Sequence, residues 1–131
     1  MLKTASVKDY MSANLVTFTP DMDIQEAISQ FINKRISGAP VVDNIGNLVG
    51  MLTEQDCIKI ALTASYYAES AGKVAEYMHP IVKTVEARAS IVEVATQFLQ
   101  DGYRRYPVME DNRLVGQISR HDVLKALESL W

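Results

Sequence analysis

The sequence predicts an α/β protein made of two tandem β-α-β-β-α repeats that pack face to face about a pseudo-two-fold axis. Three observations predict this fold. The chain repeats itself over most of its length, each repeat shows the same order of strand and helix patterns, and the composition (48% hydrophobic, 22% charged) is that of an ordinary globular protein. One copy would form a small sheet that is marginal alone, so we expect two copies to share a core.

The similarity between the halves is a fixed offset between matching residues. The segment VKDYM at residues 7–11 recurs as VAEYM at residues 74–78, an offset of 74 − 7 = 67. A one-residue deletion in a later turn reduces the offset to 66, which then links Gly50 to Gly116. Such a long-period repeat indicates a duplicated structural unit. The first repeat is accordingly placed at residues 1–68 and the second at residues 69–131.

Three strands are predicted in each repeat from short runs of apolar and β-branched residues bounded by turn residues. In the first repeat they are expected at Leu15–Phe18, Ala39–Asp43 and Leu48–Leu52. In the second they are expected at Val82–Val85, Tyr106–Glu110 and Leu114–Ile118. The last two strands of each repeat are separated by a short polar turn, which predicts a hairpin.

Two helices are predicted in each repeat. The first is amphipathic and opens with a capping-box pattern, Asp23 to Glu26 in one repeat and Ser90 to Glu93 in the other. In the second repeat this helix is expected to stop at Gly102. The last helices of the two repeats are expected to begin near Glu54 and Arg120.

The charge and cysteine content argue against several classes of function. Lysine and arginine total 13 against 16 acidic residues, and a net charge of −3 argues against broad nucleic-acid binding, which needs clustered basic residues. No apolar run approaches the roughly 20 residues that span a bilayer, and the N-terminus lacks the apolar core of a secretory signal. The single cysteine, Cys57, cannot form an internal disulfide and indicates core packing. We therefore expect a cytoplasmic protein that binds neither nucleic acid nor a membrane.

The sharpest motif is a strand that begins with glycine and leads into Ser/Thr-x-x-Asp at the start of a helix. It reads GMLTEQD at Gly50–Asp56 and GQISRHD at Gly116–Asp122. A helix N-terminus favours a phosphate, a hydroxyl adds a donor, and a carboxylate one turn on can accept hydrogen bonds from a ribose diol. The same spacing is also an ordinary capping box that needs no ligand. Its occurrence after a matching hairpin in both repeats favours a ligand site.

The two copies resemble CBS domains, a family named after cystathionine β-synthase. The resemblance is carried by ISGAPVVD and YRRYPVME, by LVGMLT and LVGQIS, and by the Thr/Ser-x-x-Asp helix starts, and it covers the chain from about Val7 to its end. It implies a regulatory module that binds AMP, ADP, ATP, S-adenosylmethionine or a related adenosyl ligand in clefts between the repeats. It also implies a homodimer formed through the last helices.

The resemblance implies two ligand sites, each with residues from both repeats. The favoured site would comprise Leu15, Val16, Ile36 and Ser37 around the base, with Arg104, Arg105, Ile118, Ser119, Arg120 and Asp122 around the sugar and phosphate. The second site would comprise Leu52, Thr53, Asp56, Val82, Lys83 and Tyr103, with Arg104 beside them.

Charge distinguishes the favoured site from the second. Residues 102–120 carry four arginines against two acidic residues, 4 − 2 = +2, whereas residues 35–54 carry one arginine against two acidic residues, 1 − 2 = −1. Arg120 follows Ser119 where Glu54 follows the threonine of the other motif, so one helix start attracts a phosphate that the other repels. The alternative is that the arginines are solvated surface residues.

The expected function is regulatory ligand sensing without catalysis. The chain has no nucleophile–base motif, no P-loop and no metal-ligand spacing around His79 or His121, so no cofactor or metal is required. Two alternatives stay open: a structural or interaction module with no small-molecule ligand, and an enzyme acting on a nucleotide. An apolar stripe that ends at Trp131 favours a homodimer, and we expect any regulatory output to go to a separate, unidentified protein.

Overall fold

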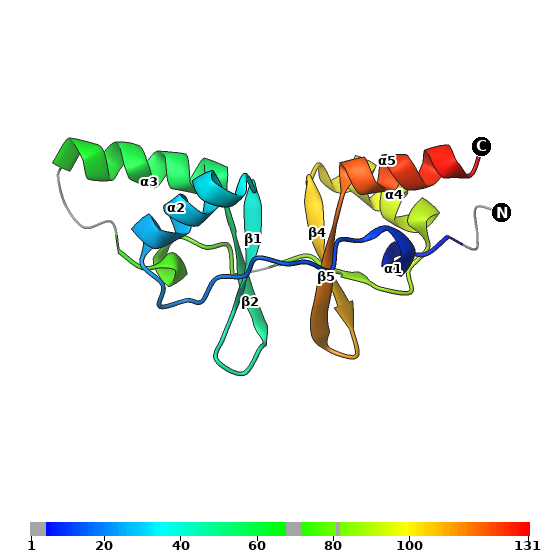
Figure 1. Ribbon diagram of the computed structural model, residues 1–131, viewed down its shortest axis with the longest axis horizontal. Coiled ribbons are helices and arrows are strands. Elements are labelled where there is room, and N and C mark those ends of the chain that lie inside the picture. Colours follow the sequence, from blue (N-terminus) through cyan, green and yellow to red (C-terminus); the bar gives the residue numbers. More distant parts are fainter. Residues whose placement is uncertain (1–4, 68–71, 81) are drawn as a thin grey trace. The chain divides into compact units, whose positions relative to one another are not determined.

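The computed structural model shows the predicted order of helix, hairpin and helix in both halves of the chain, whereas the predicted first strand forms only in the second half (Figure 1). The structure describes residues 5–67, 72–80 and 82–131, with only the backbone of residues 64–67. The chain divides into unit 1, which takes Met1–Leu15 and Lys83–Trp131, and unit 2, which takes Val16–Val82.

Unit 2 is a hairpin flanked by helices. Its elements are α2 (Ile24–Lys34), β1 (Gly38–Val42), β2 (Leu48–Thr53), α3 (Glu54–Tyr67) and a 3-10 helix, η2 (Val74–Glu76). β1 and β2 pair antiparallel with Gly38 opposite Thr53, so the hairpin leads directly into α3. Phe18 adds a single parallel bridge to Val41 of β1.

Unit 1 repeats this arrangement with a fuller sheet. Its elements are α1 (Val7–Tyr10), β3 (Val85–Glu86), α4 (Ile91–Asp101), β4 (Arg105–Glu110), β5 (Arg113–Ser119) and α5 (Arg120–Ser129). The strand order is β3-β4-β5, with β3 parallel to β4 and β5 antiparallel to it. Arg105 lies opposite Ser119, so this hairpin leads into α5 as the other leads into α3.

The first strand of each repeat is shorter than predicted. Of the range expected at Leu15–Phe18 only Phe18 pairs, and of the range at Val82–Val85 only its last residue joins a strand, Val85–Glu86. Phe18 donates a backbone hydrogen bond to Pro40 and accepts one from Val42. Both bonds to β1 are made by this one residue, so the predicted residues before Phe18 form no strand.

The two predicted capping boxes at the amphipathic helices have different outcomes. Ser90 caps α4, and its hydroxyl accepts hydrogen bonds from two backbone N–H groups of the first turn, but the reciprocal bond from its own N–H to Glu93 that would complete the predicted box is not formed. The box expected between Asp23 and Glu26 is wrong, because Asp23 makes no side-chain cap bond to α2. Its carboxylate instead lies 2.8 Å from the ammonium of Lys73, a charge-assisted contact that competes with capping. Gly102 ends α4 in the left-handed conformation with φ 74°, as predicted.

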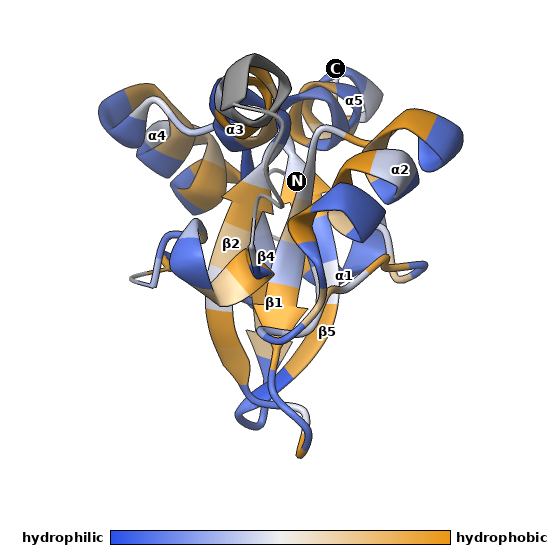
Figure 2. Ribbon diagram, turned by 90° about the vertical axis from the view of Figure 1, so that its left-hand side faces the viewer, coloured by the Kyte–Doolittle hydropathy of each residue, from blue (hydrophilic) through white to orange (hydrophobic). Residues whose placement is uncertain are grey.

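Each unit has an aromatic contact within its own core. In unit 2 the rings of Phe18 and Phe31 meet edge to face at 5.3 Å, and in unit 1 Phe98 lies 4.4 Å from Tyr106. Figure 2 shows α2 and α4 with hydrophobic and hydrophilic bands along their length, the pattern of a helix that buries one face. Within the described ranges, no helix has the length and apolar character needed to cross a bilayer.

Cys57 is a core residue, as predicted. Its side chain is buried among the residues of the unit 2 core. Burial raises the pKa of the Cys57 thiol to about 11, and the nearby carboxylates of Asp56 and Glu54 add to the effect. A thiol with this pKa is a poor nucleophile at neutral pH, which fits a packing role.

The units differ from the sequence repeats because the opening segments of the repeats are exchanged. Val7 belongs to the first repeat, but its N–H donates to the Ala89 carbonyl at 3.0 Å and its side chain is fully buried in unit 1. Val74 opens the matching segment, and it is fully buried in unit 2, where its N–H donates to the Met22 carbonyl at 2.9 Å. Each unit therefore completes its core with the segment that opens the other repeat.

The exchanged segments also pair with the last strand of each hairpin. Ser12 and Gln117 exchange two backbone hydrogen bonds of 2.9 Å in unit 1, and His79 and Met51 exchange bonds of 2.9 and 3.0 Å in unit 2. The neighbouring strand glycine permits this approach, because a Cβ on Gly116 would lie 2.8 Å from the Ser12 carbonyl oxygen. The glycine of the sequence motif thus has a packing reason that needs no ligand.

Candidate functional site

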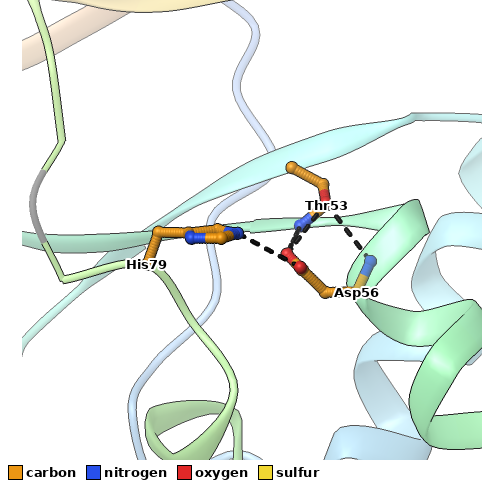
Figure 3. A network of polar contacts seen from close by, with 3 residues as sticks. All are labelled: Thr53, Asp56 and His79. Carbon is orange, nitrogen blue, oxygen red and sulfur yellow. Dashed lines mark hydrogen bonds and ion pairs between the residues drawn. The ribbon is translucent and has the colours of Figure 1, made fainter.

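The Thr53–Asp56 motif forms a capping box at the start of α3 (Figure 3). The Asp56 Oδ2 atom accepts hydrogen bonds from the Thr53 backbone N–H at 3.0 Å and from its hydroxyl at 2.8 Å. The Asp56 N–H in turn donates to Thr53 Oγ1 at 3.4 Å. The box therefore uses one oxygen of the carboxylate and leaves Oδ1 for another partner.

His79 supplies that partner in unit 2. Its Nε2 atom lies 3.1 Å from Asp56 Oδ1, and Figure 3 shows the imidazole beside the carboxylate, with Thr53 contacting it from a different direction. The His79 side chain is 63% exposed and that of Asp56 is 15% exposed, so the pair stands at the surface with the carboxylate on its inner side. Both oxygens of Asp56 are thus engaged within unit 2.

The Ser119–Asp122 motif forms the same box at the start of α5. The Asp122 Oδ2 atom accepts from the Ser119 N–H at 2.9 Å and from its hydroxyl at 3.0 Å, and the Asp122 N–H donates to Ser119 Oγ at 3.2 Å. Across the parts of the chain that the structure describes, Asp122 Oδ1 receives no hydrogen bond. The two boxes share one geometry and differ in whether the second carboxylate oxygen has a partner.

Charge at the two helix starts differs as the sequence predicts. In unit 1 the Arg120 N–H donates to the Arg104 carbonyl at 3.1 Å, so two exposed arginines flank the first turn of α5. The equivalent bond in unit 2 joins the Glu54 N–H to the Ser37 carbonyl at 3.0 Å. A cationic pair adds to the positive end of the α5 dipole, whereas a glutamate opposes it at α3.

Two predicted site residues have no surface exposed within their units. Leu52 and Ile118, each the residue before the Thr or Ser of the motif, are fully buried in the cores of their units. Arg105 is half-buried and lies opposite Ser119 in the β4–β5 register. Six residues of the favoured site belong to unit 1: Arg104, Arg105, Ile118, Ser119, Arg120 and Asp122.

The remaining predicted residues are divided between the units. Leu15, Lys83 and Tyr103 belong to unit 1, and Val16, Ile36, Ser37, Leu52, Thr53, Asp56 and Val82 belong to unit 2. A site that combines residues of both units stays a prediction.

Two predicted residues of the second site already have partners within unit 1. Lys83 Nζ lies 2.8 Å from Asp101 Oδ2, which also accepts a hydrogen bond from the Tyr106 hydroxyl at 2.8 Å. Lys83 and Tyr106 together lower the pKa of the Asp101 carboxyl. The Tyr103 ring meets Tyr106 edge to face at 5.8 Å. Lys83 would have to share its charge with Asp101 in order to bind a phosphate.

Sequence reasoning missed the role of His79. No metal-ligand spacing surrounds this residue in the sequence, yet it contacts Asp56 across 23 positions. The internal repeat holds a usable signal, because His79 occupies the position of Ser12 under the offset of 79 − 12 = 67. A position that carries a histidine in one repeat and a serine in the other therefore indicates where the two candidate sites could differ.

Comparison with known proteins identifies the family. The profile of the CBS domain family matches residues 7–63 and again residues 74–129. CBS domain-containing protein YhcV of Bacillus subtilis is 32% identical over 91% of this chain and 83% of its own length. Protein MJ1225 of Methanocaldococcus jannaschii, described as uncharacterised, is 32% identical over 95% of this chain, which spans only 44% of that relative.

Solved structures confirm the fold. CBSX2 of Arabidopsis thaliana, solved in complex with AMP, is 25% identical, and the match covers 95% of this chain and 97% of that one with a TM-score of 0.84. The CBS domain pair of protein MJ0100, solved with 5′-methylthioadenosine and S-adenosyl-L-methionine, is 27% identical over 97% of this chain and 98% of that one, with a TM-score of 0.80. The predicted α/β class and the duplication are therefore confirmed, and the chain belongs to the CBS domain family as a pair of CBS domains.

Proposed function

We propose that the chain is a regulatory sensor that binds an adenine nucleotide or a related adenosyl ligand, such as AMP, ADP, ATP or S-adenosylmethionine. The proposal is supported by two similar CBS pairs, one solved with AMP and one with methylthioadenosine and S-adenosylmethionine. These ligands share an adenosine, so the common recognition element is a base joined to a ribose. The residues that suit a ribose are the carboxylates of the two capping boxes.

One observation carries the proposal: the Asp122 carboxylate presents Oδ1, to which the described residues donate no hydrogen bond, next to the positively charged start of α5. A carboxylate oxygen in this position can accept from a ribose hydroxyl. The N-terminus of α5, with Arg104 and Arg120 beside it, suits a phosphate or another anionic group. For the base we keep the prediction of Leu15, Val16, Ile36 and Ser37.

Calorimetric titration with AMP, ADP, ATP and S-adenosylmethionine tests the proposal directly. We expect saturable binding of at least one ligand and a matching rise in the thermal midpoint, because a ligand that binds only the folded state stabilises it. The alternative is a structural or interaction module that acts through its surface alone. Absence of heat and of any midpoint shift with all four ligands at millimolar concentration would favour that alternative.

We propose that the module works without catalysis. The nearest approach to a catalytic group is His79 with Asp56, but the Asp56 carboxylate lies between the imidazole and the Thr53 hydroxyl. A general base must contact the nucleophile itself, and here the hydroxyl donates to the carboxylate instead. Turnover of ATP that disappears in an Asp122→Ala variant would contradict this proposal.

We also propose a homodimer that forms through the apolar residues left exposed on α5 and just beyond it. Core packing accounts for Val123 and Leu127 of the predicted stripe, but Leu124 is 63% exposed and Trp131 is 92% exposed. Light scattering should give twice the mass of 14.6 kDa, and Leu124→Glu should shift the mass toward that of the monomer. A monomeric native chain would remove the dimer from the proposal. The cytoplasmic location and a separate regulated protein stay as proposals from the sequence.

A further inference from the structure

We infer that His79 is a specificity-determining residue that disfavours ligand binding at the Thr53–Asp56 box and so directs the ligand to the Ser119–Asp122 box. The inference rests on the proposed function, because it concerns which of two carboxylates a ribose can reach. Its basis is the contact between His79 Nε2 and Asp56 Oδ1 at 3.1 Å. No sequence motif marks this contact.

The two carboxylates have the same capping geometry, so the carboxylates themselves differ in the partner of the second oxygen. Oδ2 accepts hydrogen bonds from the backbone N–H and the hydroxyl of Thr53 in one box and of Ser119 in the other, all between 2.8 and 3.0 Å. Only Oδ1 is left for a ligand in either box. A ribose hydroxyl would have to displace the imidazole or share the oxygen with it at Asp56, whereas at Asp122 no described residue donates to the oxygen that it would reach.

The backbone places His79 and Ser12 in equivalent positions. Each follows a methionine of the repeated Tyr-Met pair, and each exchanges two hydrogen bonds with the second residue after Leu-Val in the last hairpin strand, Met51 or Gln117. The Ser12 side chain is exposed and, within the described ranges, makes no hydrogen bond to Asp122. An imidazole in one copy and a hydroxymethyl group in the other thus occupy equivalent backbone positions, each paired with the last hairpin strand that leads into its own capping box.

The surroundings of Asp56 reinforce the effect. Glu54 is exposed in the first turn of α3 and adds a negative charge next to the helix start. An anionic ligand at this box therefore meets a like charge and an occupied carboxylate together. Replacing Glu54 would change the charge in the first turn of α3. Replacing His79 removes the competing hydrogen bond and leaves that charge as it is.

The test measures the Asp56 box in isolation, in an Asp122→Ala background that removes the competing carboxylate. Adding His79→Ser, which copies the residue of the other repeat, should tighten AMP binding by about three- to tenfold, because a competing hydrogen bond is lost. Adding His79→Gln instead should give little gain, since its amide N–H₂ can still donate to Asp56. Backbone bonds to Met51 are retained in both variants.

The reciprocal exchange tests the same idea at the other box. Ser12→His in the otherwise native chain should weaken AMP binding by about three- to tenfold, because it supplies the carboxylate of Asp122 with an imidazole. Thermal midpoints of the unliganded variants should stay close to that of the native chain, which separates an effect on the ligand from an effect on folding.

The results that overturn the inference differ from those that overturn the proposed function. Native protein that binds AMP, with no gain or a loss from His79→Ser, refutes the role of His79 and leaves the sensor proposal intact. Native protein that binds none of the adenosyl ligands refutes the sensor proposal. The contact itself has a ligand-free readout, since the ¹⁵N shifts of the His79 ring should change on Asp56→Ala, and unchanged shifts would also refute the inference.

Discussion

Replacing Asp122 by alanine is expected to weaken AMP binding by about ten- to hundredfold. Asp122 Oδ1 is the acceptor that we assign to the ribose, and hydrogen bonds to charged groups contribute about 1.5–3 kcal/mol each. Alanine removes the acceptor and its charge, and the Ser119 hydroxyl, which donates to that carboxylate in the native box, is a neutral group that cannot restore the charge. Titration calorimetry measures the loss of affinity.

Asp56→Ala is the matched control for this loss. It removes the same capping carboxylate from α3 that Asp122→Ala removes from α5, so the two variants lose equivalent helix-start hydrogen bonds. Because Asp56 Oδ1 is already paired with His79, we expect its loss to change the affinity for AMP by less than about threefold. Equal losses of affinity in the two variants would refute the asymmetry between the boxes.

The parts of the site that could be predicted from sequence are those that depend on local spacing. Thr53 and Asp56 lie three positions apart, as do Ser119 and Asp122, and that spacing alone brings the carboxylate back to the N–H at the helix start. The hairpins were equally predictable, because apolar runs around a short polar turn leave little choice of register. Local geometry therefore fixes both boxes regardless of whether a ligand binds.

The parts that could not be predicted are contacts between distant segments. His79 reaches Asp56 across 23 positions, and Lys83, which precedes α4 in the sequence, reaches the carboxylate of Asp101 at the end of that helix. Spacing carries no information about such pairs, since they follow from the path of the chain between elements. The exchange of opening segments has the same origin, because a repeat boundary in sequence does not say with which copy a segment packs.

The exchange of segments yields the second prediction, which concerns stability. Val7→Ala should lower the free energy of opening of unit 1, although Val7 belongs to the first repeat, and Val74→Ala should do the same to unit 2. Both side chains are fully buried, and truncation removes buried carbon and leaves a cavity, a loss of about 2 kcal/mol. Amide exchange should then be about 30-fold faster at Val108 in the first variant and at Val41 in the second.

Comparing Val7→Ala with Val74→Ala tests which unit each segment completes, because the two side chains are equally buried. Val7 and Val74 have the same side chain, the same burial and equivalent positions in their repeats, so their substitutions differ only in the unit they affect. If each segment stabilised its own repeat, Val7→Ala would speed exchange in the β1–β2 hairpin and spare β4–β5. That reversed pattern, or equal acceleration in both hairpins, would contradict the exchange, because a missing contact in one core first increases the opening of the elements that share that core.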